Sequence, residues 1–289
     1  MIVTFHIARM WHPLLSVLVV TALFATSRQV VAEQLKPQTV AAFDRYVMLS
    51  EKNMPTATTG KSPSGTFLRV DGLAPMQRDG ALVRLEKGEM LVERLQTLNN
   101  GQSIPVPDGM IHHWVGTVFI PHATLAQTLA FLQDYDNQYK FYLPEVQRSK
   151  LIRRQGNDFE ISQLLRETKI ITVTLDANYN VKYVFLSPDS ATAYSRSTRI
   201  AEIANAGKPD EFEKQPGDDG GYLWRLYSYW RFLQRDGDVY TQLEAISLTR
   251  DIPTGLGWLV GPFVSSIPQE SLEFTMTRTR EALAKIADH

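Results

Sequence analysis

The sequence predicts an α+β fold in which a curved antiparallel sheet of about seven strands grips one long C-terminal helix. Apolar residues alternate with a period of two through much of residues 146–250, as in half-buried strands. Short turn signals such as Asp236-Gly237-Asp238 separate these runs, and antiparallel hairpins need only such short connections. Residues 268–287 then carry an apolar stripe at helical spacing. Because a twisted sheet cannot lie flat against one helix, we expect it to curl and leave space between them.

The first strand of this fold is predicted at Met110–Ile120, and Thr124 can cap a helix that follows it. A second short helix is expected near Asn137–Leu143. The terminal helix is expected to span Pro268–Ala287, with Ser266 as its cap. The remaining predicted strands are Val146–Arg153, Phe159–Leu165, Ile170–Leu175, Asn180–Leu186, Ala193–Ile203, Tyr222–Gln234 and Val239–Arg250.

Residues 1–32 have the pattern of a secretory signal peptide. Arg9 gives a weakly positive start, Leu14–Ala25 is an uncharged apolar run, and Val30-Val31-Ala32 offers small residues for cleavage. The apolar run has twelve residues, whereas a membrane-spanning helix needs about 20. We therefore predict cleavage and export to the periplasm or the outside of the cell, with an uncleaved anchor as the alternative.

The rest of the chain divides into an N-terminal segment, residues 33–107, and a main domain, residues 108–289. Residues 33–54 have helical spacing, and residues 55–65 form a polar stretch rich in Pro, Gly, Ser and Thr. Accessory strands are predicted in the segment at Phe67–Val70, Ala81–Leu85 and Met90–Leu95.

Composition excludes several classes of function. The net charge is −1, so no strong electrostatic partner such as nucleic acid is expected. Cysteine is absent, which removes disulfides, thiolate catalysis and cysteine-bound metals. His112 and His113 are adjacent in a strand and point to opposite faces, so they do not predict a metal site. No Gly-x-Ser-x-Gly elbow or phosphate-binding loop occurs, and we expect no catalytic residue and no cofactor.

The order of elements in residues 108–287 resembles the START and birch-pollen-allergen superfamily, also called SRPBCC, which has the helix-grip fold. Local segments that carry the resemblance are His113-Trp114-Val115-Gly116, Gln242–Pro253 and Gly261–Pro268. The resemblance implies binding of a hydrophobic ligand such as a lipid, sterol or quinone. A minority of the superfamily are enzymes, such as polyketide cyclases. Residues 33–107 have no counterpart in the minimal fold.

One predicted strand is unusually rich in aromatic residues and supplies candidate cavity residues. With a period of two, Trp224, Leu226, Trp230 and Phe232 share one face. Aromatic walls with a few polar tips suit an apolar ligand that bears one polar group. We therefore predict that this face lines a ligand cavity, and a filled core without a cavity is the alternative.

Charged residues within strands are candidates for contact with a ligand headgroup. Arg199 lies in one strand and Glu244 in the last. Because an unpaired buried charge is very costly, an inward Glu244 would need a partner, and an inward Arg–Glu pair could anchor a ligand headgroup. The alternative is a ladder of charges on the outer face of the sheet.

The C-terminal region supplies the remaining candidates. Trp258 and Phe263 lie in an apolar segment before the predicted helix, where they can gate the cavity and touch a membrane, or simply plug it. Leu272 and Met276 lie on the apolar face of the helix. If this face pressed on the strands with no void, a carrier function would be excluded.

These observations predict a non-catalytic binder of a hydrophobic small molecule. The alternatives are a polyketide cyclase or hydrolase-like enzyme that uses the same cavity, and a structural protein with a filled core. A carboxyl group with a strongly raised pKa inside the cavity would favour the enzyme.

Overall fold

In a computed structural model of the chain, the structure describes residues 35–54, 66–169, 171–252 and 257–287, without the side chains of residues 257–263. The chain divides into two units, Met1–Ala32 and Glu33–His289, and the fold below is that of the second. The predicted signal peptide lies outside the described residues, so cleavage and export stay predictions. Among the helices that are described, none has the length and apolar character to cross a membrane.

The fold is built on one antiparallel sheet of nine strands. Along most of the sheet, neighbouring strands follow the order β5, β6, β7, β8, β10 and β11. The strand β11 then pairs with β4, the first strand of the main domain. The strand β1 extends this edge, and the short β9 pairs with the end of β8. The sheet strands are β1 (Leu91–Arg94), β4 (Gly109–Ile120), β5 (Val146–Gln155), β6 (Asp158–Thr168), β7 (Thr172–Ser187), β8 (Ser190–Ala204), β9 (Phe212–Glu213), β10 (Arg225–Arg235) and β11 (Asp238–Arg250).

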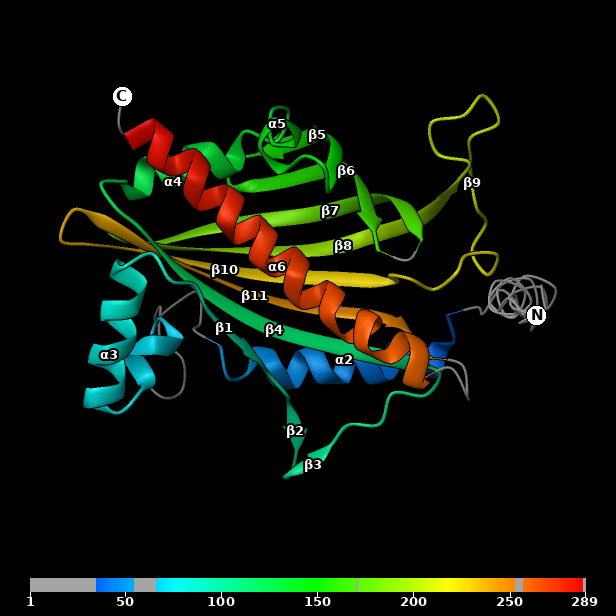
Figure 1. The fold of residues 1–289 in the computed structure, drawn as a ribbon, viewed down its shortest axis with the longest axis horizontal. Helices are drawn as coiled ribbons and strands as arrows, with labels where there is room; N and C mark the ends of the chain where they lie inside the picture. The colour runs from blue at the N-terminus through cyan, green and yellow to red at the C-terminus, as the bar shows by residue number, and fades with distance from the viewer. Residues whose placement is uncertain (1–34, 55–65, 170, 253–256, 288–289) are drawn as a thin grey trace, which may run out of the picture. The chain divides into compact units, whose positions relative to one another are not determined.

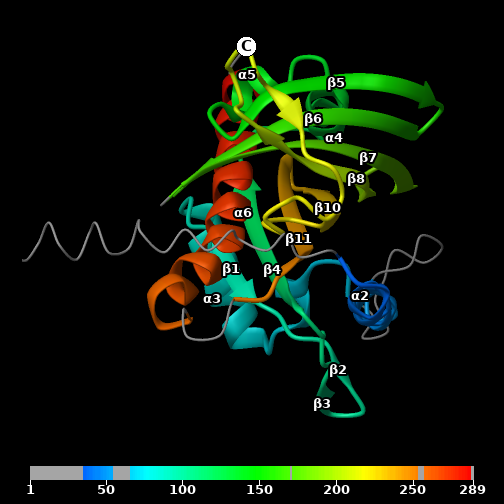
Figure 2. The same ribbon diagram turned by 90° about the vertical axis from the view of Figure 1, so that its right-hand side faces the viewer.

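Three helices lie on the inner face of this curved sheet. The helix α6 (Gly257–Ala287) crosses the sheet diagonally, and α4 (Leu125–Gln133) and α5 (Tyr139–Tyr142) lie near its C-terminal end (Figure 1). Thr124 caps α4 as predicted, since its hydroxyl accepts a hydrogen bond from the backbone N–H of Gln127. Strands β5 to β8 arch over one side of α6 (Figure 2). The predicted α+β class, with a curved antiparallel sheet gripping a long helix, is confirmed.

Two predicted strands are one continuous strand in the structure. Residues 176–178 form no turn between Ile170–Leu175 and Asn180–Leu186, because they pair with β6 on one side and β8 on the other within β7. A register shift between Asn178 and Tyr179 in the pairing with β8 absorbs the irregularity. The polar turn-like residues are therefore strand residues at a bulge.

The terminal helix is also longer than predicted. It begins at Gly257, not Pro268, so Ser266 is an interior residue and not a cap. Proline inside a helix removes one backbone hydrogen bond. Pro268 is nevertheless within α6, on the part of the helix that lines the cavity.

The N-terminal segment is mainly helical. It contains α2 (Pro37–Glu51), the 3₁₀ helix η1 (Arg69–Gly72), α3 (Pro75–Glu86) and a small hairpin of β2 (Leu98–Asn99) and β3 (Gln102–Ser103). The prediction of strands at Phe67–Val70 and Ala81–Leu85 is wrong. Pro75 starts a helix that places Ala81 and Leu85, four residues apart, on one buried side. Only the third predicted strand is present, as β1.

The outer face of the sheet has cores of its own, which the N-terminal segment covers. The helix α2 and α6 lie on opposite sides of β4 and β11 (Figure 2). Apolar residues of α2 and Met54 meet strand residues in a core formed by Phe43, Tyr46, Val47, Met54, Trp224, Tyr229, Ile246 and Leu248. A smaller core under η1 and α3 contains Leu68, Val70, Ala81, Leu85 and Tyr240. The central strands are therefore buried on both faces.

Candidate functional site: an apolar cavity beneath the C-terminal helix

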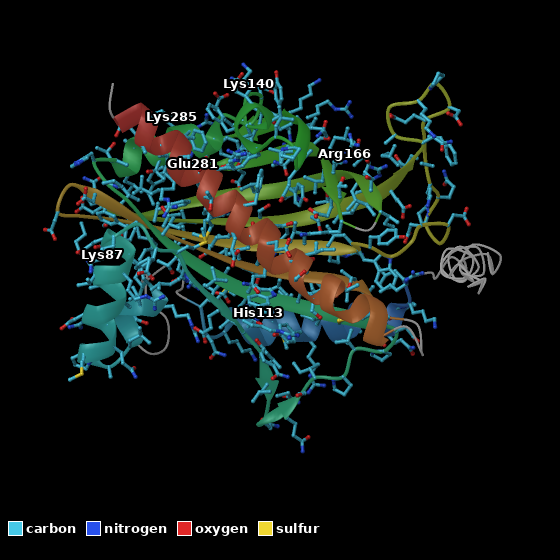
Figure 3. The ribbon with its side chains drawn as sticks, viewed as in Figure 1. Lys87, His113, Lys140, Arg166, Glu281 and Lys285 are labelled. Atoms are coloured by element: carbon cyan, nitrogen blue, oxygen red, sulfur yellow. The ribbon has the colours of Figure 1, made fainter. Side chains whose placement is uncertain are left out.

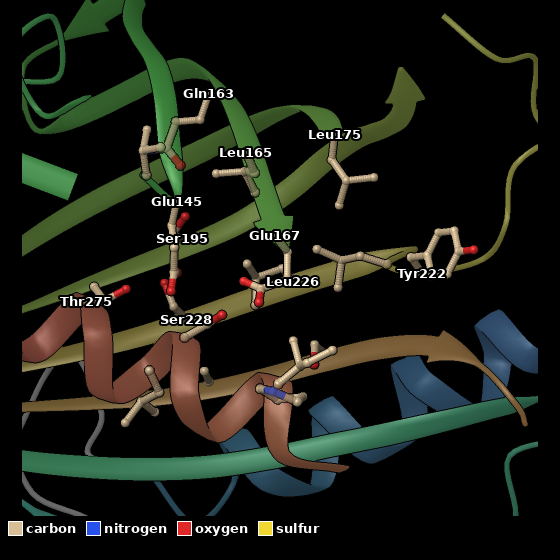
Figure 4. Close-up of a pocket in the computed structure, with 18 of the residues that line it drawn as sticks. Glu145, Gln163, Leu165, Glu167, Leu175, Ser195, Tyr222, Leu226, Ser228 and Thr275 are labelled. Atoms are coloured by element: carbon tan, nitrogen blue, oxygen red, sulfur yellow. The ribbon is translucent and has the colours of Figure 1, made fainter. Parts of the chain in front are cut away.

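A cavity of about 630 Å³ lies between α6 and the inner face of the sheet. Side chains from β4 to β8, from β10 and β11, and from all three inner helices line it, and Figure 4 shows part of this lining. The lining is mainly apolar and aromatic and includes Trp114, Leu132, Tyr142, Val146, Ile161, Leu165, Leu175, Tyr179, Val181, Tyr183, Leu226, Trp230, Leu243, Ile267 and Leu272. The predicted space between helix and sheet is therefore present.

The helix α6 has two parts with different neighbours. Met276, Thr279 and Leu283 are fully buried in the solid core. Nearer the start of α6, Ser271, Leu272 and Thr275 border the cavity. Leu272 and Met276 pack closely on β4, because a Cβ atom at Gly116 would lie 2.6 Å from each of them. The helix thus presses on the sheet at one end and spans a void at the other, so the condition that would exclude a carrier is not met.

Buried tyrosines form one end of the cavity. The hydroxyl groups of Tyr135 and Tyr183 are 2.9 Å apart, and that of Tyr142 is 2.8 Å from Thr279 Oγ1 on α6. Burial raises the pKa of all three phenols above the usual value of 10. These phenols are therefore neutral in the folded protein and act as hydrogen-bonded walls.

Three of the predicted ligand-binding residues line the cavity. Leu226 and Trp230 are on the inner face of β10, and Leu272 faces them from α6. The alternation in β10 thus identified its inner face correctly. Direct ligand contact by these residues remains a prediction.

The structure places two other aromatic candidates elsewhere. Trp224 precedes β10, so the alternation of the strand does not extend to it, and it packs in the outer core beneath α2. Its indole Nε1 donates to Asp219 Oδ1 at 3.2 Å. Phe232 has the predicted orientation, but it stacks on Trp230 and is fully buried in the solid core.

Glu244 is buried in a polar network on the outer face and does not face the cavity. Its carboxylate accepts hydrogen bonds from His113 Nε2 at 2.9 Å and Arg231 Nη2 at 3.0 Å. His113 Nδ1 is 3.0 Å from the hydroxyl of Tyr46 on α2, which accepts from the backbone N–H of Thr97 at 2.9 Å. His113 is labelled in Figure 3. The Glu244–Arg231 pair joins β11 to β10, and His113, through its contact with Tyr46, links this network to α2.

The remaining candidates do not line the described part of the cavity. Arg199 is partly exposed and forms ion pairs with Asp176 and Glu213. Met276 is buried against Gly116, next to the void but outside its lining. Trp258 and Phe263 are in the first turns of α6, and their side chains lie outside the described residues.

Two carboxyl groups in the cavity wall were not predicted. Glu145 precedes β5 and Glu167 lies at the end of β6 (Figure 4). Burial and the nearby Glu167 raise the pKa of Glu145 to about 8, against the opposing effects of Ser271, which hydrogen-bonds the carboxyl, and Lys169. Burial also raises the pKa of Glu167. Lys169 forms an ion pair with Glu270 on α6. Glu145 follows a proline in a loop, and no periodicity in the sequence signals it.

Unpartnered hydroxyl groups also line the cavity. Ser195 on β8 and Ser228 on β10 are direct cross-strand partners, and Ser247 lies on the adjacent β11. None of the three side chains makes a hydrogen bond within the described part of the chain. Tyr179 is 5 % exposed, and its hydroxyl is buried without a partner among the described residues. The alternation of Tyr179, Val181 and Tyr183 is the sequence signal that could have identified β7 as a cavity wall.

The variant Glu145→Gln is expected to gain stability relative to the wild type as pH rises. The folded state holds the Glu145 proton up to about pH 8, whereas the usual pKa is 4.5. Stability of the wild type therefore falls as pH rises through this window, and glutamine cannot ionise. The difference in unfolding free energy should reach about 2 kcal/mol at pH 9. Thermal melts from pH 5 to 9 check this, with Glu281→Gln, an exposed position on α6, as the control for net charge. A difference that stays constant with pH would contradict the environment described for Glu145.

Within the described residues, no group of three or more His, Cys, Asp or Glu side chains is arranged to hold a metal ion.

The chain was compared with known proteins. No family model matches the sequence, and no curated protein matches it. Solved structures that are similar include a STAR-related lipid transfer protein from Xanthomonas axonopodis (15% identity, TM-score 0.41, 66% of this chain and 98% of that one). A START superfamily protein from Mycobacterium smegmatis is also similar (11% identity, TM-score 0.42, 60% of this chain and 98% of that one). An aromatase/cyclase from Streptomyces sp. R1128 is another (12% identity, TM-score 0.38, 62% of this chain and 94% of that one). At 15% identity or less and TM-scores of 0.42 or less, these similarities carry no conclusion about the family or function of this chain.

Proposed function

We propose that the protein binds or carries a hydrophobic small molecule in the cavity beneath α6, without catalysing a reaction. The observation that carries this proposal is a space of about 630 Å³ with a mainly apolar and aromatic lining. Ligand pockets typically have volumes of about 300–1,000 Å³ and this kind of lining. A void of this size also forfeits packing contacts when it is empty, and an apolar ligand restores them.

We further propose that the protein acts after export and exchanges its ligand at a membrane surface. Support for membrane contact comes from apolar side chains on the segments that border the cavity. Two residues that line the cavity are also exposed at the surface. Ile171, between β6 and β7, is 52% exposed, and Tyr222, before β10, is 40% exposed. Exposed apolar groups of this kind suit transient contact with lipid.

Binding of N-phenyl-1-naphthylamine, a neutral dye that fluoresces in apolar surroundings, tests the proposal. The wild type is expected to bind the dye, and Ser228→Trp to weaken binding by at least about tenfold, because the indole fills cavity space. Ser162→Trp is the matched control. Ser162 is likewise half-buried on a strand of the same sheet, but it alternates with the cavity residues Ile161 and Gln163 and so faces away. Equal dye binding by both variants, or none by the folded wild type, would overturn the proposal.

A second candidate function is an acid–base enzyme of the cyclase or hydrolase kind that uses the same cavity. The observation that favours it is Glu145, a cavity carboxyl whose pKa is raised to about 8 by burial. Incubation of the protein with its own extracted ligand distinguishes the two candidates. A carrier leaves the mass and chromatographic retention of the ligand unchanged, whereas an enzyme converts it and Glu145→Gln does not.

A further inference from the structure

Two carboxyl groups and several serine hydroxyls are among the polar groups that line the cavity. Glu145, just before β5, and Glu167 of β6 present the carboxyl groups, and Ser271 of α6 hydrogen-bonds Glu145. The central strands add the hydroxyls of Ser195 and Ser228, which are cross-strand partners. Each serine hydroxyl can donate or accept a hydrogen bond, whereas a carboxylate, once it is ionised, can only accept.

Tyr179 gives a second, independent sign that a polar ligand group belongs here. Its side chain is 5% exposed and lines the cavity, and its hydroxyl has no hydrogen-bond partner among the described residues. Buried polar atoms in native proteins are nearly always paired, with protein, water or ligand. Ser197 and Ile161 flank Tyr179 on the neighbouring strands, and Ser197 Oγ accepts a hydrogen bond from the backbone N–H of Leu226 on β10. The described residues therefore leave the Tyr179 hydroxyl without a partner.

The deeper part of the cavity is apolar and suits a hydrocarbon tail. Across the sheet, Tyr183, Ala193, Trp230 and Leu243 form one row of register partners, and all four line the cavity. The next row toward the polar part contains Val181, Ser195, Ser228 and Ala245. Polarity thus changes within two residues along the strands, as a head-and-tail ligand requires.

Positive charges also border the cavity. The charge of Lys169 acts on Glu145 and opposes the rise in its pKa, but Lys169 is itself paired with Glu270 on α6. Arg166 is exposed, and Arg250 ends β11, so both lie where the cavity meets the surface. Above about pH 8, where Glu145 is ionised, a carboxylate or phosphate beside Glu145 and Glu167 would face like charges, whereas a hydroxyl or amine would find hydrogen-bond acceptors.

On the basis of the proposed function, we infer that the cavity selects an amphiphile whose head is a hydrogen-bond donor, a hydroxyl or an amine, and rejects a carboxylate or phosphate head. Glu145, Ser195 and Ser228, all labelled in Figure 4, are the residues assigned to the head. The apolar row from Tyr183 to Leu243 is assigned to the tail.

Displacement of N-phenyl-1-naphthylamine by three probes with equal chains tests this inference. Dodecan-1-ol and dodecylamine are expected to displace the dye at concentrations at least about tenfold lower than dodecanoate at pH 9. Equal displacement by all three, or preference for dodecanoate, overturns the inference and leaves the carrier proposal standing. If the folded wild type does not bind the dye, the carrier proposal itself fails.

Variants separate a headgroup role from a general effect on the cavity. In Glu145→Gln, the disadvantage of dodecanoate should shrink to about threefold or less. The affinity for dodecan-1-ol should fall by no more than about threefold, because the amide oxygen of glutamine still accepts a hydrogen bond. In the wild type, the disadvantage of dodecanoate should grow from pH 7 to 9, because Glu145 ionises in this range beside Glu167, Lys169 and Glu270. In Glu145→Gln, the disadvantage of dodecanoate should not change with pH. Arg166→Gln, at the exposed rim, is the control and should leave the ranking unchanged. A ranking that is unaffected by Glu145→Gln, or reversed by Arg166→Gln, would place the head at the rim and contradict the assignment.

Discussion

Replacement of Glu244 by alanine is expected to lower the free energy of unfolding by about 3–5 kcal/mol. Only 9% of each side chain of the Glu244–Arg231 pair is exposed, and the variant would leave the arginine buried without its counter-charge. Although burial opposes ionisation of Glu244, the hydrogen bond from His113 and the charge of Arg231 keep its pKa below the usual value. His113 would also lose its acceptor, and with it the link to Tyr46 on α2.

Urea unfolding of Glu244→Ala and Glu93→Ala compares a buried ion pair with an exposed one. Glu93 pairs with Arg69 at 2.6 Å, but about half of each side chain is accessible to solvent. The loss from Glu93→Ala should therefore stay at or below about 1 kcal/mol. A loss of this size for Glu244→Ala as well would show that the network beneath α2 is accessible to water.

Phe43→Ala is expected to cost about 3–5 kcal/mol of unfolding free energy, because the residue is fully buried in the outer core. Its ring meets that of Tyr227 edge to face, with centroids 5.2 Å apart. This residue belongs to α2, outside the minimal helix-grip domain, so the effect measures how much the N-terminal segment contributes to the stability of the sheet.

Denaturant unfolding and dye binding together check this prediction. Met48→Ala, on the exposed side of the same helix, should change stability by no more than about 0.5 kcal/mol. Dye affinity of folded Phe43→Ala should match that of the wild type, since α2 and the cavity lie on opposite faces of the sheet. A small loss of stability would mean that α2 is not an integral layer, and a loss of dye binding would mean that the two faces are coupled.

The antiparallel sheet could be predicted from sequence because its determinants are local. The Asp236-Gly237-Asp238 turn lies directly between β10 and β11, and the period-two pattern on both sides fixes the register of this hairpin. The capping box at Thr124 likewise depends only on residues three apart.

The errors arose where distant contacts decide local structure. Residues 176–178 resemble a turn, yet strands on both sides hold them extended. Ala81–Leu85 resembles a strand, but its apolar residues fit a helix that packs on the outer face. Trp224 has the spacing of a cavity residue, yet β10 begins one residue after it.

Much of the candidate site was equally beyond the sequence. Alternation identified Leu226 and Trp230, but it cannot show that Glu244 lies under α2, a helix about 200 positions earlier in the chain. Glu145 has no periodic or motif signal, and only the curl of β5 and β6 over α6 brings it to the cavity. Such long-range juxtapositions follow from the tertiary fold and not from local patterns.

Native mass spectrometry of the protein purified without detergent, followed by organic extraction, tests the central claim most directly. We predict a species heavier than the bare chain by the mass of one apolar molecule, which the extraction releases. Ser228→Trp should give the bare mass, and Ser162→Trp should retain the addition. A wild type that carries nothing and also fails to bind the dye when folded would contradict the account.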